Sequence, residues 1–299
     1  MTPLVTILFD GNDPEKLFLP LIKKLSKNSI AITNIPSFDF ETENGIHVSP
    51  SLNILLKTLG PRSKRLRHSH KLISVFRNFD FATTNLPDFD LAISFLLTIW
   101  LRNELPLLDL YSRLATSLNI SYRIMPLFDP LPHLVVKTES GSKVTPLQLI
   151  NGKNLEDLKG FTYGKLDKAK IVEETKKTLE NSDIVLLFQV SPITIYFLKS
   201  IGSLKKVLEN YKGTIIYLLP QEIRDTDKKI LALMGYSEDL QGLIRMAHEQ
   251  VDAIIFDEKN QDLITELSDI KVTFYPAPYE FETREGMKNF IYNVLKVLK

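Results

Sequence analysis

The chain has 299 residues, and its 37 lysine and arginine residues nearly balance 36 aspartate and glutamate residues, which leaves a net charge of +1. This balance creates no strong field toward nucleic acid or an acidic membrane, so we expect neither as a partner. The sequence has no cysteine, which excludes disulfides, iron–sulfur clusters and thiol chemistry and favours a cytoplasmic location. We expect no signal peptide, and the longest apolar run, residues 91–101, is far shorter than the ~20 residues that cross a bilayer.

Strand-like apolar segments alternate with helix-like segments along the chain. In chain order, strands are expected at residues 4–9, 30–33, 120–124, 184–188, 214–219, 253–257 and 271–275. Helices are expected from Pro14 onward and at residues 50–59, 91–101, 106–118, 168–181 and 283–298. Residues 134–138 and 143–149, separated by the turn Ser140-Gly141, predict a hairpin.

This alternation predicts the fold class, an α/β fold of Rossmann-like type with a mainly parallel sheet flanked by helices. We expect a single domain over residues 1–299, with a small hairpin-containing subdomain inserted at about residues 125–165. Ligands of such sheets bind beyond the carboxyl ends of the strands. The segments to inspect are therefore residues 10–13, 34–38, 189–194, 220–225 and 257–260.

Several common catalytic and cofactor motifs are missing. The sequence has no Gly-x-Gly-x-x-Gly, P-loop or Gly-x-Ser-x-Gly, and its five histidines lack zinc-site spacing. Residues 62–71 form a basic run, which either holds a polyanion such as a diphosphate or is simply solvated.

An acidic pair, Asp88 and Asp90, lies directly before the apolar run 91–101. One interpretation is a helix start, with Asp88 as N-cap and Asp90 in the first turn. The other is a ligand site, because carboxylates at the lip of a buried element are costly unless a metal ion or another group pairs with them. The apolar run itself and residues 105–110 belong either to the core or to the face of a homodimer.

Six segments in one order resemble the 2-phospho-L-lactate transferase (CofD-like) family, to which the gluconeogenesis-factor (YvcK-like) family is related. The acidic pair lies in Leu-Pro-Asp-Phe-Asp-Leu-Ala, residues 86–92, which resembles the family's Leu-Gly-Asp-x-Asp-x-Ala. Residues 49–53, Ser-Pro-Ser-Leu-Asn, resemble Ser-Pro-Asp-Leu-Asp, and residues 190–194, Val-Ser-Pro-Ile-Thr, resemble Ser-Asn-Pro-Ile-Thr. The other three are residues 124–126, 134–141 and 251–257.

The resemblance implies a transferase that uses Mg²⁺. It would transfer a phospholactyl group from a guanosine-diphosphate-linked donor to the deazaflavin Fo in the biosynthesis of coenzyme F-420. It implies catalytic roles for Asp88 and Asp90, with Asp88 and Asn53 as metal ligands, since hard cations take oxygen ligands. The residues that would bind the two substrates are Gly11, Asn12, Asn34, Ser191, Pro192 and Thr194.

The sequence also departs from the family where charge matters most. The family's loop Gly-Gly-Thr-Gly is Asp10-Gly11-Asn12-Asp13 here, and the metal-binding aspartate of Ser-Pro-x-Leu-Asp is Asn53. Carboxylates in the first loop repel a phosphate unless a cation intervenes, and an asparagine contributes no charge to a metal. A second hypothesis is therefore a divergent, non-catalytic homologue that binds a nucleotide or another small molecule, or regulates a partner enzyme.

Overall fold

The structure is a computed structural model that describes residues 4–11, 17–60, 86–142, 144–153, 155–281 and 283–298. Two predictions fall outside these residues, namely the role of Asn12 and the nature of the basic run 62–71.

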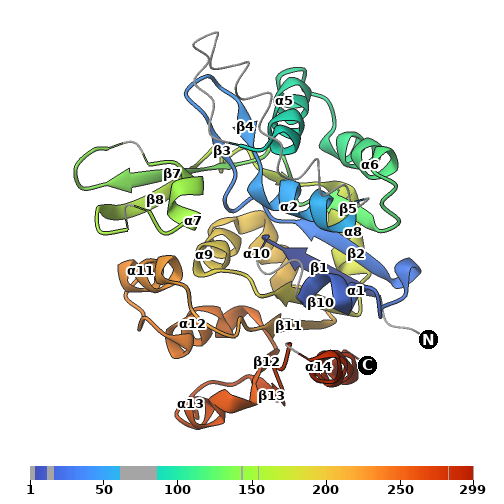
Figure 1. Ribbon diagram of the computed structural model, residues 1–299, viewed down its shortest axis with the longest axis vertical. Coiled ribbons are helices and arrows are strands. Elements are labelled where there is room, and N and C mark those ends of the chain that lie inside the picture. Colours follow the sequence, from blue (N-terminus) through green and yellow to red (C-terminus); the bar gives the residue numbers. More distant parts are fainter. Residues whose placement is uncertain are drawn as a thin grey trace.

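A seven-stranded parallel sheet lies at the centre, with the strand order β13-β12-β11-β10-β1-β2-β5. This order descends the long axis of the molecule in Figure 1 from β5 and β2 to β13. The strands are β1 (Val5–Phe9), β2 (Ile30–Asn34), β5 (Arg123–Pro126), β10 (Ile184–Phe188), β11 (Thr214–Leu218), β12 (Ala253–Asp257) and β13 (Thr273–Ala277). The parallel sheet confirms the predicted α/β, Rossmann-like fold class.

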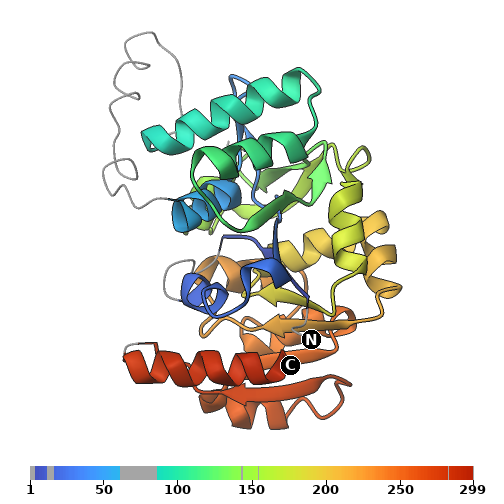
Figure 2. The same ribbon diagram turned by 90° about the vertical axis from the view of Figure 1, so that its right-hand side faces the viewer.

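Helices cover both faces of the sheet, which explains why its central strands are almost continuously apolar (Figures 1 and 2). One face packs on α1 (Leu19–Ile22), α2 (Pro50–Leu59), α5 (Asp88–Arg102), α6 (Leu107–Ser117) and α14 (Arg284–Val297). The other packs on α8 (Glu173–Glu180), α9 (Pro192–Ser200), α10 (Gly202–Glu209), α11 (Asp225–Leu233), α12 (Leu240–Ala247) and α13 (Gln261–Thr265). Alternation along β1 sends Ile7 to the first core and Leu8 to the second.

Three small antiparallel sheets accompany the main sheet. They pair β3 (Phe40–Glu41) with β4 (His47–Val48), β6 (Phe128–Asp129) with β9 (Lys170–Ile171), and β7 (His133–Thr138) with β8 (Leu158–Gly164). Most of these strands lie in or next to the segment predicted as an inserted subdomain. The organisation of the chain as one domain stays a prediction.

Two predicted elements were wrong in detail. The strand partner of β7 is β8 and not residues 143–149, where α7 (Pro146–Ile150) forms instead. Thr145 and Gln148 cap this helix reciprocally, and Pro146 starts it, so this short apolar segment becomes a helical turn. The helix predicted from residue 168 begins only at Glu173, because Lys170–Ile171 pairs with β6 as β9.

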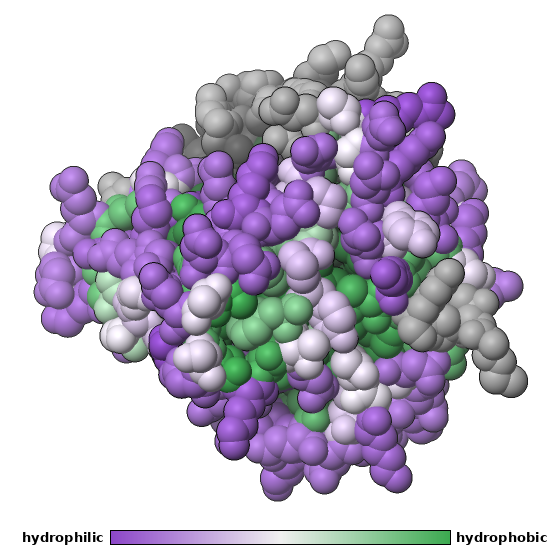
Figure 3. All heavy atoms as spheres, turned by 90° about the horizontal axis from the view of Figure 1, so that it is seen from below, coloured by the Kyte–Doolittle hydropathy of each residue, from purple (hydrophilic) through white to green (hydrophobic). Residues whose placement is uncertain are grey.

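The far edge of the sheet is formed by β13. Seen from this end, hydrophobic and neutral residues occupy the middle of the surface and hydrophilic ones surround them (Figure 3). Tyr275 on β13 and Tyr292 on α14 contribute exposed aromatic surface. Among the described residues, no helix has the length and apolar composition needed to cross a membrane.

Candidate functional site

The candidate site lies where the order in which strands are added to the sheet reverses. After β1 the next strand, β2, is added on one side, whereas β10 to β13 extend the sheet on the other side. The carboxyl ends of β1 and β10 therefore flank a topological switch point, the usual ligand site of open α/β sheets. The structure brings to this place five of the predicted substrate-binding residues: Gly11, Asn34, Ser191, Pro192 and Thr194.

A buried carboxylate, Asp10, spans the switch point. Asp10 follows β1 and is only 4% exposed. Its Oδ2 accepts hydrogen bonds from the backbone N–H of Ser191 (2.9 Å), from Ser191 Oγ (3.1 Å) and from Thr194 Oγ1 (2.7 Å). Ser191 is the N-cap of α9, and Pro192 is its first residue. The negative charge of Asp10 thus occupies the position at a helix N-terminus that favours an anion.

The hydroxyl groups around Asp10 are bonded to one another as well. Thr194 Oγ1 lies 3.0 Å from Ser191 Oγ and 2.7 Å from Ser37 Oγ, and all three side chains are buried. The predicted substrate-binding hydroxyl groups of α9 are therefore hydrogen-bonded to one another and to Asp10.

Gly11 lies against the beginning of α2. Its φ angle of +103° is in the region that favours glycine, and a Cβ atom there would meet Ile54 Cδ1 at 3.2 Å. Ser51 Oγ donates a hydrogen bond to the carbonyl of Ile35 at 3.0 Å. These contacts hold the first turns of α2 against the loops that follow β1 and β2.

Two buried amide oxygens near this junction, Asn34 Oδ1 and Asn53 Oδ1, have no hydrogen-bond partner among the residues that the structure describes. Asn34 ends β2 and donates through Nδ2 to Tyr111 Oη at 3.0 Å. Burial raises the pKa of Tyr111, so its hydroxyl stays protonated. An unsatisfied buried acceptor costs about 1–3 kcal/mol. These two oxygens are therefore suited to a hydrogen-bond donor or to a cation.

The acidic pair lies at the start of α5, and its two members have different environments. Pro87 is the N-cap, so the prediction that Asp88 caps the helix was wrong by one residue, while Asp90 does lie in the first turn. Asp88 is half-buried. Asp90 is buried and accepts a hydrogen bond at 2.7 Å from Nζ of Lys57 on α2.

This arrangement does not fit Mg²⁺. Among the described residues no group of three or more His, Asp or Glu side chains is placed to hold a metal ion. The carboxylate of Asp90 is paired with the Lys57 ammonium, one helical turn after Asn53. Mg²⁺ is usually held by one or two carboxylates, and a lysine ammonium beside them repels it.

Sequence reasoning missed a second buried polar cluster around β3 and β4. The fully buried carboxylate of Asp39 accepts a hydrogen bond from Ser49 Oγ at 2.8 Å and lies 3.2 Å from His47 Nε2. Burial raises the pKa of Asp39, against the lowering effect of His47 and Ser49. His47 also lines a cavity of about 650 Å³. The sequence signal for this cluster was Asp39, an acidic residue between Phe38 and Phe40.

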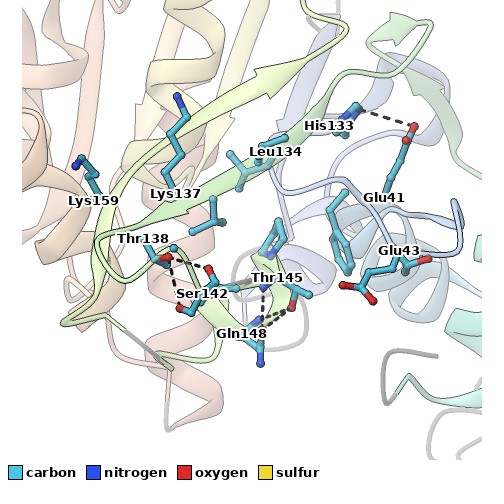
Figure 4. A pocket seen from close by; sticks show the side chains of 17 residues that line it. Glu41, Glu43, His133, Leu134, Lys137, Thr138, Ser142, Thr145, Gln148 and Lys159 are labelled. Carbon is cyan, nitrogen blue, oxygen red and sulfur yellow. Dashed lines mark hydrogen bonds and ion pairs between the residues drawn. The ribbon is translucent and has the colours of Figure 1, made fainter. Parts of the chain in front are cut away.

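A cavity of about 830 Å³ lies between the small sheets and α7, and neither member of the acidic pair lines it (Figure 4). Glu41, Glu43 and His133 lie at one end of it, and Lys137 and Lys159 lie at the other. Burial lowers the pKa of His133, against the raising effect of Glu41. None of the residues predicted to bind substrate or metal lines this cavity.

The fold and the polar network at its switch point define a Rossmann-like α/β protein whose candidate site joins β1, β10 and α9. No protein-family model matches the chain. It is 20% identical to a 2-phospho-L-lactate transferase of Methanocaldococcus jannaschii over 282 residues, which cover 88% of this chain and 89% of the relative. It is 22% identical to a 2-phospho-L-lactate transferase of Methanococcus vannielii over 315 residues, with 99% and 98% covered.

Solved structures agree with the fold. Two crystal structures of a UPF0052-family protein from Bacillus halodurans superpose with TM-scores of 0.57 and 0.56 at 14% identity. They cover 92% and 95% of this chain and 88% of the other chain. Over most of its length the chain thus resembles 2-phospho-L-lactate transferases at low identity, and it shares its fold with the solved structures.

Proposed function

We propose that this protein binds a small molecule at the switch point and does not transfer a phospholactyl group from a nucleoside-diphosphate-linked donor. The observation that carries this proposal is the carboxylate of Asp10, which holds the N-terminus of α9 through three hydrogen bonds. A helix N-terminus beside a strand end is the place where such folds bind phosphate.

A donor phosphate at α9 would have to displace Asp10. Hydrogen bonds to a charged group contribute about 1.5–3 kcal/mol each, so a phosphate that replaced the carboxylate would regain about what the protein loses. The displaced carboxylate would then repel the incoming anion from a short distance. The exchange leaves little net affinity for a diphosphate at this position.

A second candidate function is the phospholactyl transfer to Fo itself, as part of coenzyme F-420 biosynthesis. The position of Asp88 favours it, because this carboxylate begins α5 and is only half-buried. It would accept the proton of the attacking hydroxyl group as a general base. Two relatives of nearly equal length that bear the transferase name support this candidate.

Two experiments distinguish the candidates. Calorimetric titration with GDP and with Fo, each with and without Mg²⁺, measures binding. Incubation with Fo and the donor, followed by mass spectrometry, measures product formation. We expect no GDP binding and no product from the wild-type protein. Product formation at ordinary enzymatic rates would establish the transferase and refute our proposal.

The variant Asp10→Gly gives the matched comparison. It vacates the N-terminus of α9, so we expect it to bind GDP where the wild-type protein does not. Asp257→Gly is the control, because Asp257 is also a buried carboxylate at the carboxyl end of a parallel strand, β12, but caps a different helical turn, residues 258–260. Asp257→Gly should leave GDP binding unchanged.

A further inference from the structure

We propose that the ammonium group of Lys57 takes the place of a divalent cation beside the acidic pair, so that this protein needs no Mg²⁺ there. The inference goes beyond the proposed function, because it concerns the cation at α2 and α5 and not the anion at α9. It would hold equally if the protein proved to be a transferase.

Lys57 and Asp90 form a close, largely buried ion pair. Lys57 lies in the last turn of α2 and Asp90 in the first turn of α5, and the two helices pack against each other. Nζ of Lys57 lies 2.7 Å from Asp90 Oδ2. The exposed fractions of the two side chains are only 20% and 12%, so solvent screens their attraction weakly.

Lys57 also compensates the negative charge of Asp90. A buried carboxylate needs hydrogen-bond donors or a positive group to offset the loss of its hydration. Lys57 supplies this compensation from the same helix that carries Asn53, which lies one turn earlier. Asn53 contributes a neutral amide oxygen where a carboxylate would strengthen the binding of a metal ion. The charge of Asp90 is therefore compensated without a metal.

The ammonium group of Lys57 repels an incoming metal ion. The repulsion between a unit charge and a doubly charged cation at about 5 Å weakens binding more than about tenfold, even at the dielectric constant of water. The effect is larger in a partly buried site. Lys57 thus selects against Mg²⁺ in the wild-type protein.

The experiment measures metal binding directly and needs no enzymatic activity. Each metal ion is titrated into the wild-type protein, Lys57→Met and the double variant Lys57→Met/Asp90→Asn. Binding of Mg²⁺ is measured by calorimetry, and binding of Mn²⁺ by electron paramagnetic resonance, which reports the free ion. We expect no saturable binding to the wild-type protein at millimolar metal. We expect Lys57→Met to bind more than about tenfold more tightly, and the double variant to lose this gain.

Two results would overturn the proposal. One is stoichiometric binding of Mn²⁺ to the wild-type protein that Asp90→Asn abolishes, and this measurement requires no change at Lys57. The other is a folded Lys57→Met protein, checked by circular dichroism, that gains no metal affinity. Lys57→Gln serves as a second neutral variant, because its amide still donates a hydrogen bond to Asp90.

Discussion

Asp10→Gly should destabilise the protein in a way that inorganic phosphate reverses. The substitution removes the carboxylate that bonds to Ser191 N, Ser191 Oγ and Thr194 Oγ1. The two hydroxyl groups keep each other and Ser37 as partners, so the principal unsatisfied group is the N–H of Ser191. Phosphate can then occupy the vacated helix N-terminus.

The magnitudes follow from these contacts. An unsatisfied buried donor costs about 1–3 kcal/mol, and the added backbone freedom of glycine costs about 0.5–1 kcal/mol. We therefore expect a loss of about 3 kcal/mol in the free energy of unfolding. Phosphate at 100 times its dissociation constant stabilises the folded protein by about 2.7 kcal/mol, which restores most of this loss.

Urea denaturation followed by circular dichroism measures the effect at increasing phosphate and constant ionic strength. The midpoint of Asp10→Gly should rise with phosphate, whereas the wild-type protein and Asp257→Gly should not respond beyond the general salt effect. If all three proteins respond to phosphate equally, Asp10 does not occupy an anion site, and the reasoning fails.

Three further predictions concern other parts of the molecule. Half-buried His133 has a lowered pKa, so on acidification the unfolded chain binds its proton first, and stability should fall as the pH drops below about 6.5. Urea denaturation from pH 7.5 to 5 should show a smaller fall in His133→Gln. Gly11→Ala should lower the free energy of unfolding by about 1–2 kcal/mol, because Gly11 has a positive φ angle and an added Cβ would contact Ile54. An unchanged midpoint in urea denaturation would contradict this. Leu96 and Ile99 on α5 are 46% and 55% exposed, and this apolar patch is too small for a stable interface. We therefore expect sedimentation equilibrium at micromolar concentration to show a monomer. A dimer that Ile99→Lys dissociates would show that α5 forms a homodimer face.

The sequence predicts the main sheet well, because its strands are short apolar runs separated by helical periodicity. Parallel strands buried on both faces, such as residues 184–188, have a pattern that few other elements share. The small sheets were harder to predict. The choice between residues 143–149 and 158–164 as the partner of β7 depends on tertiary packing and on the capping of α7, which strand periodicity does not encode.

The sequence predicted which segments form the candidate site, but not which side chains pair with one another there. The segments after β1 and β10 were both expected at the ligand-binding edge, and they do meet there. That Asp10 would bond to Ser191, 181 residues away, and that Lys57 would pair with Asp90 depend on side-chain geometry across separate elements. A charge pattern in a single sequence contains no signal for such partners.

The pairing of β1 with β10 has a consequence for how the chain folds during synthesis. Phe9 pairs with Phe188, so β1 must keep one hydrogen-bonding edge open until the intervening residues have been made. At about 5–20 residues per second this takes roughly 10–40 s. During that interval β1 is an exposed apolar strand edge, the kind of surface on which nascent chains aggregate. We therefore expect production of the protein to depend on chaperones or on slow translation, although the central strands are fully paired in the folded protein.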